Sequence, residues 1–570
     1  MKTNTFNIRK LGIFSFLVSI IFSCSTIKEL EYNVPQNPLH MKGGDVTLQI
    51  NGKFVEKGIN PKGIAEITPI FFCADGNEVP FVTEIYQGSK AAGNGKVVPS
   101  EGLKFSYSST IPYQKSMAEG EVKVRILFKM GSKEPESIMS PKIADGTIIS
   151  SLLVDLDDQV IMTSECNFQR TNSFSKSATI NFSKGKHAVS SKEMRDNDIK
   201  DLLDFVKNSI KENSKVAIKS IQISSFASPE GEVDLNNDLA EDRGNSAKKA
   251  IMSKFKRMKF EAGKEDAFYS VSPKGEDWNG FKTEVSKTDH EDKELILRVL
   301  QMTSDLNKRE KEIRNMAKTY SFLEKKVLPQ LRRATITLNY DEVGFSDDEL
   351  KNLVASNPDT LSLEEIIQAS LNEEDMNVQL KNLNNAQRLY PNDWRIRNNI
   401  GYLLYNMGDV DGASQSFEKA LSITDNATVS NNVGAVNHVK SGKSNDDIKA
   451  LFESSNTKES KYNLGLIQIE EGKYEEAITS MGNTKSYNYA LANILAEHYD
   501  AATDALDEIK NEDAKSFYLR AIIGSRSANT EMVIENLQSA FENDASLKEY
   551  AKKDREFIKY FENADFIALF

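Results

Sequence analysis

Hydrophobic and polar residues alternate with a period of two in short runs over the first part of the chain. Residues 46–50 place every second side chain on one face, and turn-forming pairs such as Asn51-Gly52 separate such runs. This pattern predicts an antiparallel β-sandwich. We assign the sandwich region to residues 43–171, with a β-rich stretch over residues 147–170 leading out of it.

The period changes between residues 172 and 342. Ile199, Leu202 and Val206 recur at three- and four-residue spacing, which is typical of one face of a helix. The expected strands are residues 178–182, 216–223, 269–272 and 334–339, and the expected helices are residues 199–210, 235–255 and a charged insertion at 291–328. Strands that alternate with helices predict an α/β or α+β unit with its helices on one face.

Residues 360–570 show no strand pattern and repeat at intervals of about 25 to 34 residues. Small and aromatic residues recur in register: Ile400-Gly401, Gly408, Ala413, Phe417 and Ala420, then Leu464-Gly465, Gly472, Tyr474 and Ala477. This spacing resembles the tetratricopeptide (TPR) repeat, in which small residues let two helices pack closely. We predict a TPR α-solenoid, with an unrelated helical bundle as the alternative. The predicted fold class is a multidomain α+β chain.

Composition limits the partners. The chain has 570 residues, which predicts about three or four domains. It carries 84 acidic and 72 basic residues, a net charge of −12, and no polybasic block. Nucleic acid is therefore excluded as an expected partner. The 39% apolar and 27% charged residues are typical of a folded chain.

The first 23 residues have the pattern of a signal peptide. Basic residues precede an apolar run at residues 11–22, which is too short to cross a bilayer. Residues 21–24 resemble a bacterial lipobox, which implies that Cys24 receives a lipid anchor; an ordinary signal peptide is the alternative. Residues 24–42 are then expected to be a tether, with the mature chain anchored to the membrane through the lipid.

Residues 225–231 close a predicted strand, and Asn236, Leu239 and Arg243 open the following helix. This arrangement resembles OmpA-like peptidoglycan-binding domains, specifically those of Bacteroidetes lipoproteins, over residues 172–342. The resemblance implies that an Asp and an Arg grip diaminopimelate of peptidoglycan, with Asn236 beside them. Ser228 occupies the position of that Asp.

The carboxylate half of this grip is present in the sequence, because Arg243 lies on the apolar stripe of its helix and needs a partner there. A ligand carboxylate or an internal group could fill that role. Ser228 offers no countercharge, and Glu230, two residues on, is the candidate substitute. The alternative is a domain that keeps the fold without the ligand.

The resemblance to TPR proteins implies a concave groove for a peptide or helix of an envelope protein. Asn398, Asn399, Asn431 and Asn432 lie on first-helix positions of adjacent repeats and could hydrogen-bond a partner's backbone. Solvated helix faces explain these residues equally well.

The sequence contains no phosphate-binding loop, nucleophile elbow or zinc-ligand spacing. We therefore predict a chain that is not an enzyme and holds no cofactor or metal. Cys73 and Cys166 could pair in an oxidising compartment or remain two thiols.

The leading hypothesis is an outer-membrane lipoprotein that faces the periplasm and tethers envelope complexes, binding peptidoglycan and partner proteins. The alternative is a surface or envelope assembly subunit whose OmpA-like domain has lost peptidoglycan binding.

Overall fold

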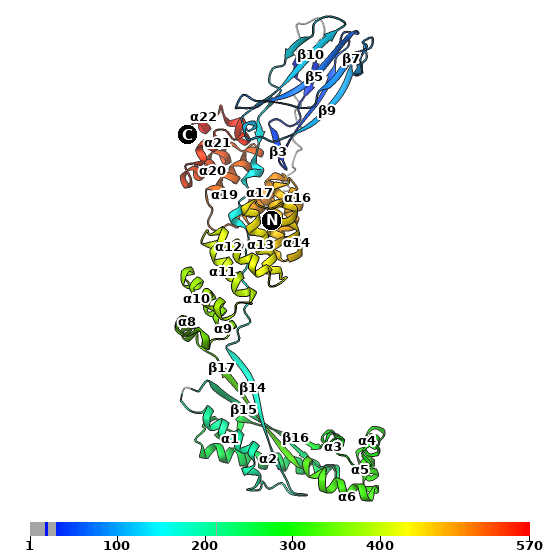
Figure 1. Ribbon diagram of the computed structural model, residues 1–570, viewed down its shortest axis with the longest axis vertical. Helices are drawn as coiled ribbons and strands as arrows, with labels where there is room; N and C mark the ends of the chain where they lie inside the picture. The colour runs from blue at the N-terminus through cyan, green and yellow to red at the C-terminus, as the bar shows by residue number, and fades with distance from the viewer. Residues whose placement is uncertain (1–17, 21–29, 213) are drawn as a thin grey trace, which may run out of the picture. The chain divides into compact units, whose positions relative to one another are not determined.

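The computed structural model describes residues 18–20, 30–212 and 214–570, in two compact units (Figure 1). One unit combines Met1–Glu165 with Leu383–Phe570, and the second is Cys166–Asn382. The fold is multidomain α+β: its N-terminal part is β-rich, its central part mixes strands with helices, and its C-terminal part is helical.

The N-terminal part consists of two sheets. The first sheet has the order β1-β2-β4-β3-β13, with β9 also paired to β4, and comprises β1 (Val18–Ile20), β2 (Leu30–Asn33), β3 (Leu39–Lys42), β4 (Asp45–Phe54), β9 (Leu103–Pro112) and β13 (Thr147–Ile148). The second has the order β11-β10-β5-β7-β8, with β12 on β10 and β6 on β5, and comprises β5 (Gly63–Phe72), β6 (Glu78–Pro80), β7 (Glu84–Gly88), β8 (Lys96–Val98), β10 (Glu121–Met130), β11 (Glu136–Met139) and β12 (Ala144–Asp145). Strands β2 and β3 lie within residues 24–42, where the sequence suggested a tether.

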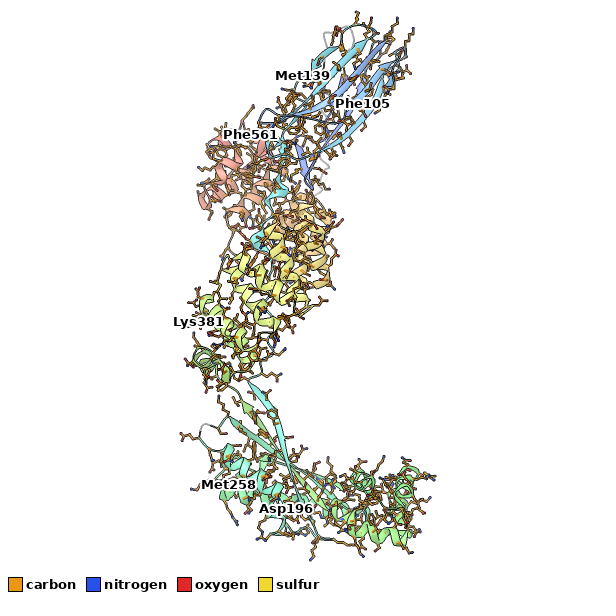
Figure 2. All side chains as sticks on the ribbon, viewed as in Figure 1. Phe105, Met139, Asp196, Met258, Lys381 and Phe561 are labelled. Atoms are coloured by element: carbon orange, nitrogen blue, oxygen red, sulfur yellow. The ribbon has the colours of Figure 1, made fainter. Side chains whose placement is uncertain are left out.

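Both sheets contribute to one hydrophobic core. Phe54 of β4, Tyr86 of β7 and Phe105 of β9 form an aromatic cluster, with ring centroids 4.9 to 5.7 Å apart. Figure 2 shows Phe105 on this two-sheet part of the chain. Alternate residues along most of β4 and β10 face this core, as the period-two pattern predicts.

The central unit contains a four-stranded sheet of order β14-β17-β15-β16. Its elements are β14 (Thr171–Asn181), α1 (Asn197–Ser209), β15 (Val216–Ala227), α2 (Val233–Arg257), β16 (Tyr269–Glu276), α3 (Trp278–Ser286), α4 (Lys293–Met302), α5 (Leu306–Asn315), α6 (Ala317–Lys326), α7 (Leu328–Leu331), β17 (Arg333–Val343), α8 (Asp347–Ser356) and α9 (Leu363–Leu371). Helix α10 (Met376–Leu389) begins in this unit and ends in the other. Strands β15 and β16 are parallel because the long helix α2 connects them, whereas β17 is antiparallel to both of its neighbours. The predicted strand and helix order over residues 172–342 is present. Helices α3 to α7 bury a hydrophobic cluster of their own.

The C-terminal part is a series of helix pairs. They are α11 (Trp394–Asn406), α12 (Val410–Leu421), α13 (Ala427–Lys440), α14 (Asn445–Ser455), α15 (Lys458–Glu470), α16 (Tyr474–Met481), α17 (Tyr487–Leu495), α18 (Tyr499–Asp507), α19 (Ala514–Arg526) and α20 (Thr530–Asn543), followed by the short α21 (Leu547–Ala551) and α22 (Ala564–Ile567). A Cβ at Gly401 would lie 2.7 Å from the ring of Phe417, and one at Gly434 would lie 2.6 Å from the ring of Phe452. Glycine therefore permits the close helix contact that the repeat pattern predicts.

Residues 149–170 differ from the predicted β-rich stretch. After β13 the chain forms the 3-10 helices η2 (Ser150–Leu153) and η3 (Leu156–Asp158), and the next strand to pair with a neighbour is β14. The segment satisfies its backbone groups with side chains of the helical repeats instead of a neighbouring strand.

Candidate functional site

Arg243, in the middle of α2, is 1% exposed. Its Nε donates to the carbonyl oxygen of Lys186 at 3.1 Å, its Nη1 to that of Phe226 at 3.0 Å and its Nη2 to that of Ser183 at 3.4 Å. Burial, and then the positive charge of Arg332, lower the pKa of Arg243 from 12.5 to about 10. Backbone carbonyls, and not a carboxylate, therefore occupy the fork of this residue.

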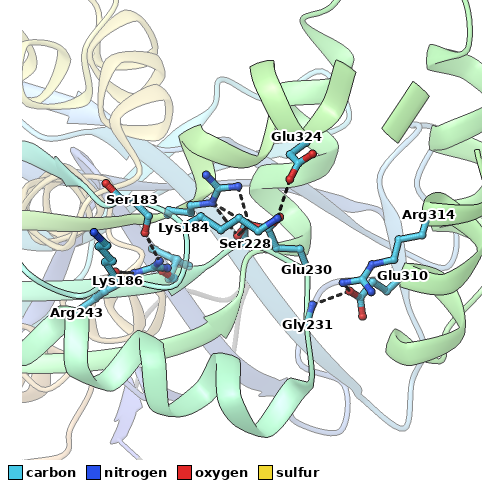
Figure 3. A network of polar contacts seen from close by, with 12 residues as sticks. Ser183, Lys184, Lys186, Ser228, Glu230, Gly231, Arg243, Glu310, Arg314 and Glu324 are labelled. Carbon is cyan, nitrogen blue, oxygen red and sulfur yellow. Dashed lines mark hydrogen bonds and ion pairs between the residues drawn. The ribbon is translucent and has the colours of Figure 1, made fainter. Parts of the chain in front are cut away.

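Ser228 and Glu230 lie in the turn after β15 and are held by basic residues (Figure 3). Ser228 Oγ donates to Glu230 Oε1 at 2.8 Å, and Arg332 Nη2 lies 2.6 Å from the same oxygen. Lys184 Nζ lies 3.2 Å from the other carboxylate oxygen. Glu230 does supply a carboxylate next to Ser228, but two cations of the chain itself already neutralise it.

Asn236, in the first turn of α2, is also paired internally. Its Nδ2 donates to Glu276 Oε1 at 2.8 Å, and the indole of Trp278 donates to the other oxygen of Glu276. The neighbouring turn is bound by the helical insertion, because the Gly231 amide donates to Glu310 Oε1 at 2.6 Å. Burial raises the pKa of Glu310. The four residues expected to bind peptidoglycan thus gather at one end of the sheet, each with a partner from the chain itself.

The asparagines predicted on the repeats are buried. They lie against the segment of the same chain that runs from η2 to β14, whose backbone is extended after η3. Asn398 and Asn399 are in α11, and Asn431 and Asn432 are in α13. In Figure 1 the segment is the cyan trace that passes α13 and α17. The reading of these residues as solvated is wrong, because they are at most 4% exposed.

Two further asparagines continue the series, Asn463 in α15 and Asn488 in α17. We call the six residues the asparagine ladder: Asn398, Asn399, Asn431, Asn432, Asn463 and Asn488. Sequence reasoning missed the last two, although a signal was present. In each repeat the asparagine precedes a hydrophobic residue and then the Gly or Ala of the first helix, as in Asn399-Ile400-Gly401 and Asn463-Leu464-Gly465.

The ladder binds main-chain groups of alternate residues. Asn463 Oδ1 accepts from the Val160 amide at 2.9 Å and its Nδ2 donates to the Val160 carbonyl at 2.8 Å. Asn432 binds both groups of Met162 in the same way, at 2.9 and 2.7 Å. Asn399 accepts from the Ser164 amide at 2.8 Å. Two-residue steps place these groups on one side of an extended backbone.

The ladder is itself hydrogen-bonded and extends to the start of the segment. Asn398 and Asn431 add donors to the carbonyls of Met162 and Val160 at 3.0 and 2.9 Å. Asn463 Nδ2 also lies 3.0 Å from Asn431 Oδ1. Asn488 binds the amide and carbonyl of Asp155 at 2.9 and 2.8 Å. Each buried amide therefore has partners, which fixes its orientation.

Acidic residues mark the N-terminal end of the bound segment. Asp155 pairs with Lys515 at 2.8 Å, and this contact raises the pKa of Lys515. Asp158 accepts from the hydroxyl of Tyr462 and from Asn488 Nδ2. Burial raises the pKa of Asp158, and the two hydrogen bonds partly offset this effect.

A buried ion pair lies at the C-terminal end of the repeats. Arg526 Nη2 is 2.5 Å from Glu556 Oε1, and Ser150 Oγ donates to that oxygen at 2.6 Å. Burial by itself would lower the pKa of Arg526, but the Glu556 carboxylate more than offsets it and raises that pKa. Helix η2, which precedes the extended segment, is thereby joined to the C-terminal 3-10 helix η8 (Arg555–Tyr560).

The buried carboxyl group of Asp554, next to Glu556, should make the free energy of unfolding depend on pH. Burial and then the charge of Glu556 raise the pKa of Asp554 from 3.8 to about 7. The folded chain then holds a proton that the unfolded chain loses, so this group's contribution is complete below about pH 4 and declines as the pH rises to about 7. We expect the free energy of unfolding of wild type, relative to Asp554→Asn, to fall by roughly 2–4 kcal/mol between pH 4 and 8. Chemical denaturation of both proteins across this range measures the difference, and parallel pH profiles would contradict it.

The cysteines, the possible metal ligands and the apolar helices also bear on the predictions from the sequence. Cys73 is buried in the β-rich part, Cys166 donates to Glu364 in the central unit, and no disulfide joins them. Within the described residues no group of three His, Cys, Asp or Glu is placed to hold a metal ion. None of the described helices is long and apolar enough to cross a bilayer. Cys24, the predicted lipidation site, lies outside the described residues.

Comparison with known proteins identifies the repeats. Residues 395–426 and 459–482 match the tetratricopeptide repeat family. No curated protein matches the chain. Similar solved structures include PilW, a type IV pilus biogenesis factor, with 14% sequence identity and a TM-score of 0.27 over 39% of this chain and 97% of PilW. A tetratricopeptide repeat protein from Parabacteroides merdae has 13% identity and a TM-score of 0.29 over 42% of this chain and 96% of that protein. YrrB, a TPR protein with an unusual peptide-binding site, is also similar, with 22% identity and a TM-score of 0.24 over 30% of this chain and 97% of YrrB. The family match shows that the C-terminal part contains TPR repeats, and TPR repeats serve protein–protein interaction.

Proposed function

We propose that the chain is a noncatalytic scaffold of the bacterial envelope, anchored through Cys24 to the outer membrane and facing the periplasm. The asparagine ladder carries the proposal, because it is a buried, hydrogen-bonded surface that holds an extended backbone. Such a surface suits assembly with other proteins and offers no group for covalent chemistry. The lipid anchor would raise the effective concentration of the array near membrane-bound partners.

We further propose that the OmpA-like domain is a structural part of this scaffold and has lost peptidoglycan binding. The saturated fork of Arg243 supports this second proposal, since a ligand carboxylate would have to displace three carbonyl contacts. The neutralised carboxylate of Glu230 supports it too.

The anchor and the scaffold are tested together with a Cys24→Ala variant. We expect wild type to incorporate labelled palmitate and to fractionate with outer membranes. In the variant, the incorporated label and the amount of protein in the membrane fraction should each fall at least about tenfold, because one thiol carries the lipid. In gently solubilised membranes wild type should migrate in an assembly larger than a single chain, whose full sequence has a mass of 63.8 kDa.

Cys73→Ala is the matched control, since Cys73 is buried in the β-rich core and should remain unmodified. Equal palmitate incorporation by wild type and Cys24→Ala would contradict the proposed lipid anchor. Migration of wild type at the mass of a single chain, with its lipid present, would contradict the proposed scaffold function.

A further inference from the structure

The TPR groove already holds a peptide, residues 153–165 of the same chain, which we call the resident segment. Its contacts to Asn399, Asn432 and Asn463 use only main-chain N–H and C=O groups. Any residue except proline supplies these groups. The groove is therefore built to accept an extended backbone, and its hydrogen bonds do not depend on the side chains of the occupant.

The bound segment has a defined direction. Asp155 lies at Asn488 in α17, and Ser164 lies at Asn399 in α11, so the segment runs opposite to the order of the repeats. Its N-terminal end is acidic and meets Lys515. The side chain of Ile161 packs against the hydrophobic cluster around Phe452. These side chains give the groove a preference beyond the backbone contacts.

We propose that the resident segment is a ligand in cis that closes the TPR groove, and that its release opens a site for an extended peptide with an acidic N-terminal end. The proposal rests on the proposed function of the array as a protein scaffold. A partner peptide then enters by displacing residues 153–165.

Tethering decides this competition. The resident segment is attached at both ends, to β13 and β14, so its effective concentration at the groove is of the order of millimolar. A free peptide with the same contacts does not compete at micromolar concentration. An opened groove would accept that peptide directly.

The test uses the full-length chain and a fluorescent peptide with the sequence of residues 153–165. The double substitution Val160→Pro and Met162→Pro removes the two backbone N–H groups that donate to Asn463 and Asn432. It therefore weakens the binding of the resident segment in cis. We expect the peptide to bind this variant at least about tenfold more tightly than wild type by fluorescence anisotropy. The matched control, Val160→Ala with Met162→Ala, keeps both amides and should bind like wild type.

Adding Asn432→Ala and Asn463→Ala to the proline variant should weaken peptide binding at least about tenfold, because two of the side-chain amides that bind the peptide backbone are then missing. Equal weak binding by wild type and the folded proline variant would overturn the proposal, as would a peptide affinity unchanged by loss of the two asparagines.

Hydrogen exchange on wild type provides a second measurement that does not depend on the folding of the proline variant. Amides of Val160 and Met162 should exchange at least about 100-fold more slowly than in Asn432→Ala/Asn463→Ala. Unchanged exchange would overturn the closed groove. Both experiments use only this chain and its own peptide, so their failure is distinguishable from a failure of the anchor or of envelope assembly.

Discussion

Replacing Glu556 by alanine should destabilise the C-terminal repeats by about 3–5 kcal/mol, the range for removing one partner of a buried ion pair. Arg526 would remain buried, with its Nη1 still bound to the Ile494 carbonyl at 2.8 Å but without its anionic partner. The Ser150 hydroxyl would also lose its acceptor. Hydrogen exchange of the amides in α19 measures the local opening free energy directly.

Glu556→Gln keeps the shape and one acceptor, so it should cost less than alanine. Glu562→Ala, an exposed glutamate of the same C-terminal region, is the control and should stay within about 0.5 kcal/mol of wild type. If Glu556→Ala behaved like Glu562→Ala, the ion pair would contribute nothing to the stability of the array.

Replacing Arg243 by alanine should destabilise the central unit by about 3 kcal/mol, because this buried side chain donates three hydrogen bonds to backbone carbonyls, each contributing about 1 kcal/mol. The chain has two tryptophans, Trp278 in the central unit and Trp394 in the other unit. In a Trp394→Phe background, the fluorescence of Trp278 during urea denaturation reports the central unit alone.

Arg257→Ala, an exposed position on the same helix α2, is the matched control and should cost less than about 0.5 kcal/mol. The same proteins distinguish the two readings of Arg243. A wild type that pellets with diaminopimelate-containing sacculi, and an Arg243→Ala variant that is equally stable but stays in solution, would contradict the structural role and restore the peptidoglycan grip.

Local patterns were sufficient for the types and order of most elements outside residues 24–42 and 149–170. Helical spacing at Ile199, Leu202 and Val206 predicts α1, in which all three are buried. The glycines and aromatics of the C-terminal part predict helix pairs because Gly401 and Phe417 must meet across one pair. These patterns survive in a single sequence because each repeats the same short-range packing.

The partners of polar residues needed the tertiary structure. The position of Arg243 on an apolar stripe predicts that it needs a partner, but backbone carbonyls carry no sequence signature, and those of Ser183 and Phe226 lie outside helix α2. Burial of Glu556 is likewise invisible in a sequence with 84 acidic residues. Only the folded chain decides which charges leave water and what compensates them.

The sequence by itself determined a β-rich part, a mixed central part and a repeat array with asparagines on its first helices. Only the tertiary structure decided what those asparagines bind, because Val160 and Asn463 are separated by 303 positions in the chain. The alternation of residues 147–170 resembles a strand, since an extended backbone has the same period whether a strand or a row of side-chain amides binds it. That ambiguity is physical, and only the long-range contact resolves it.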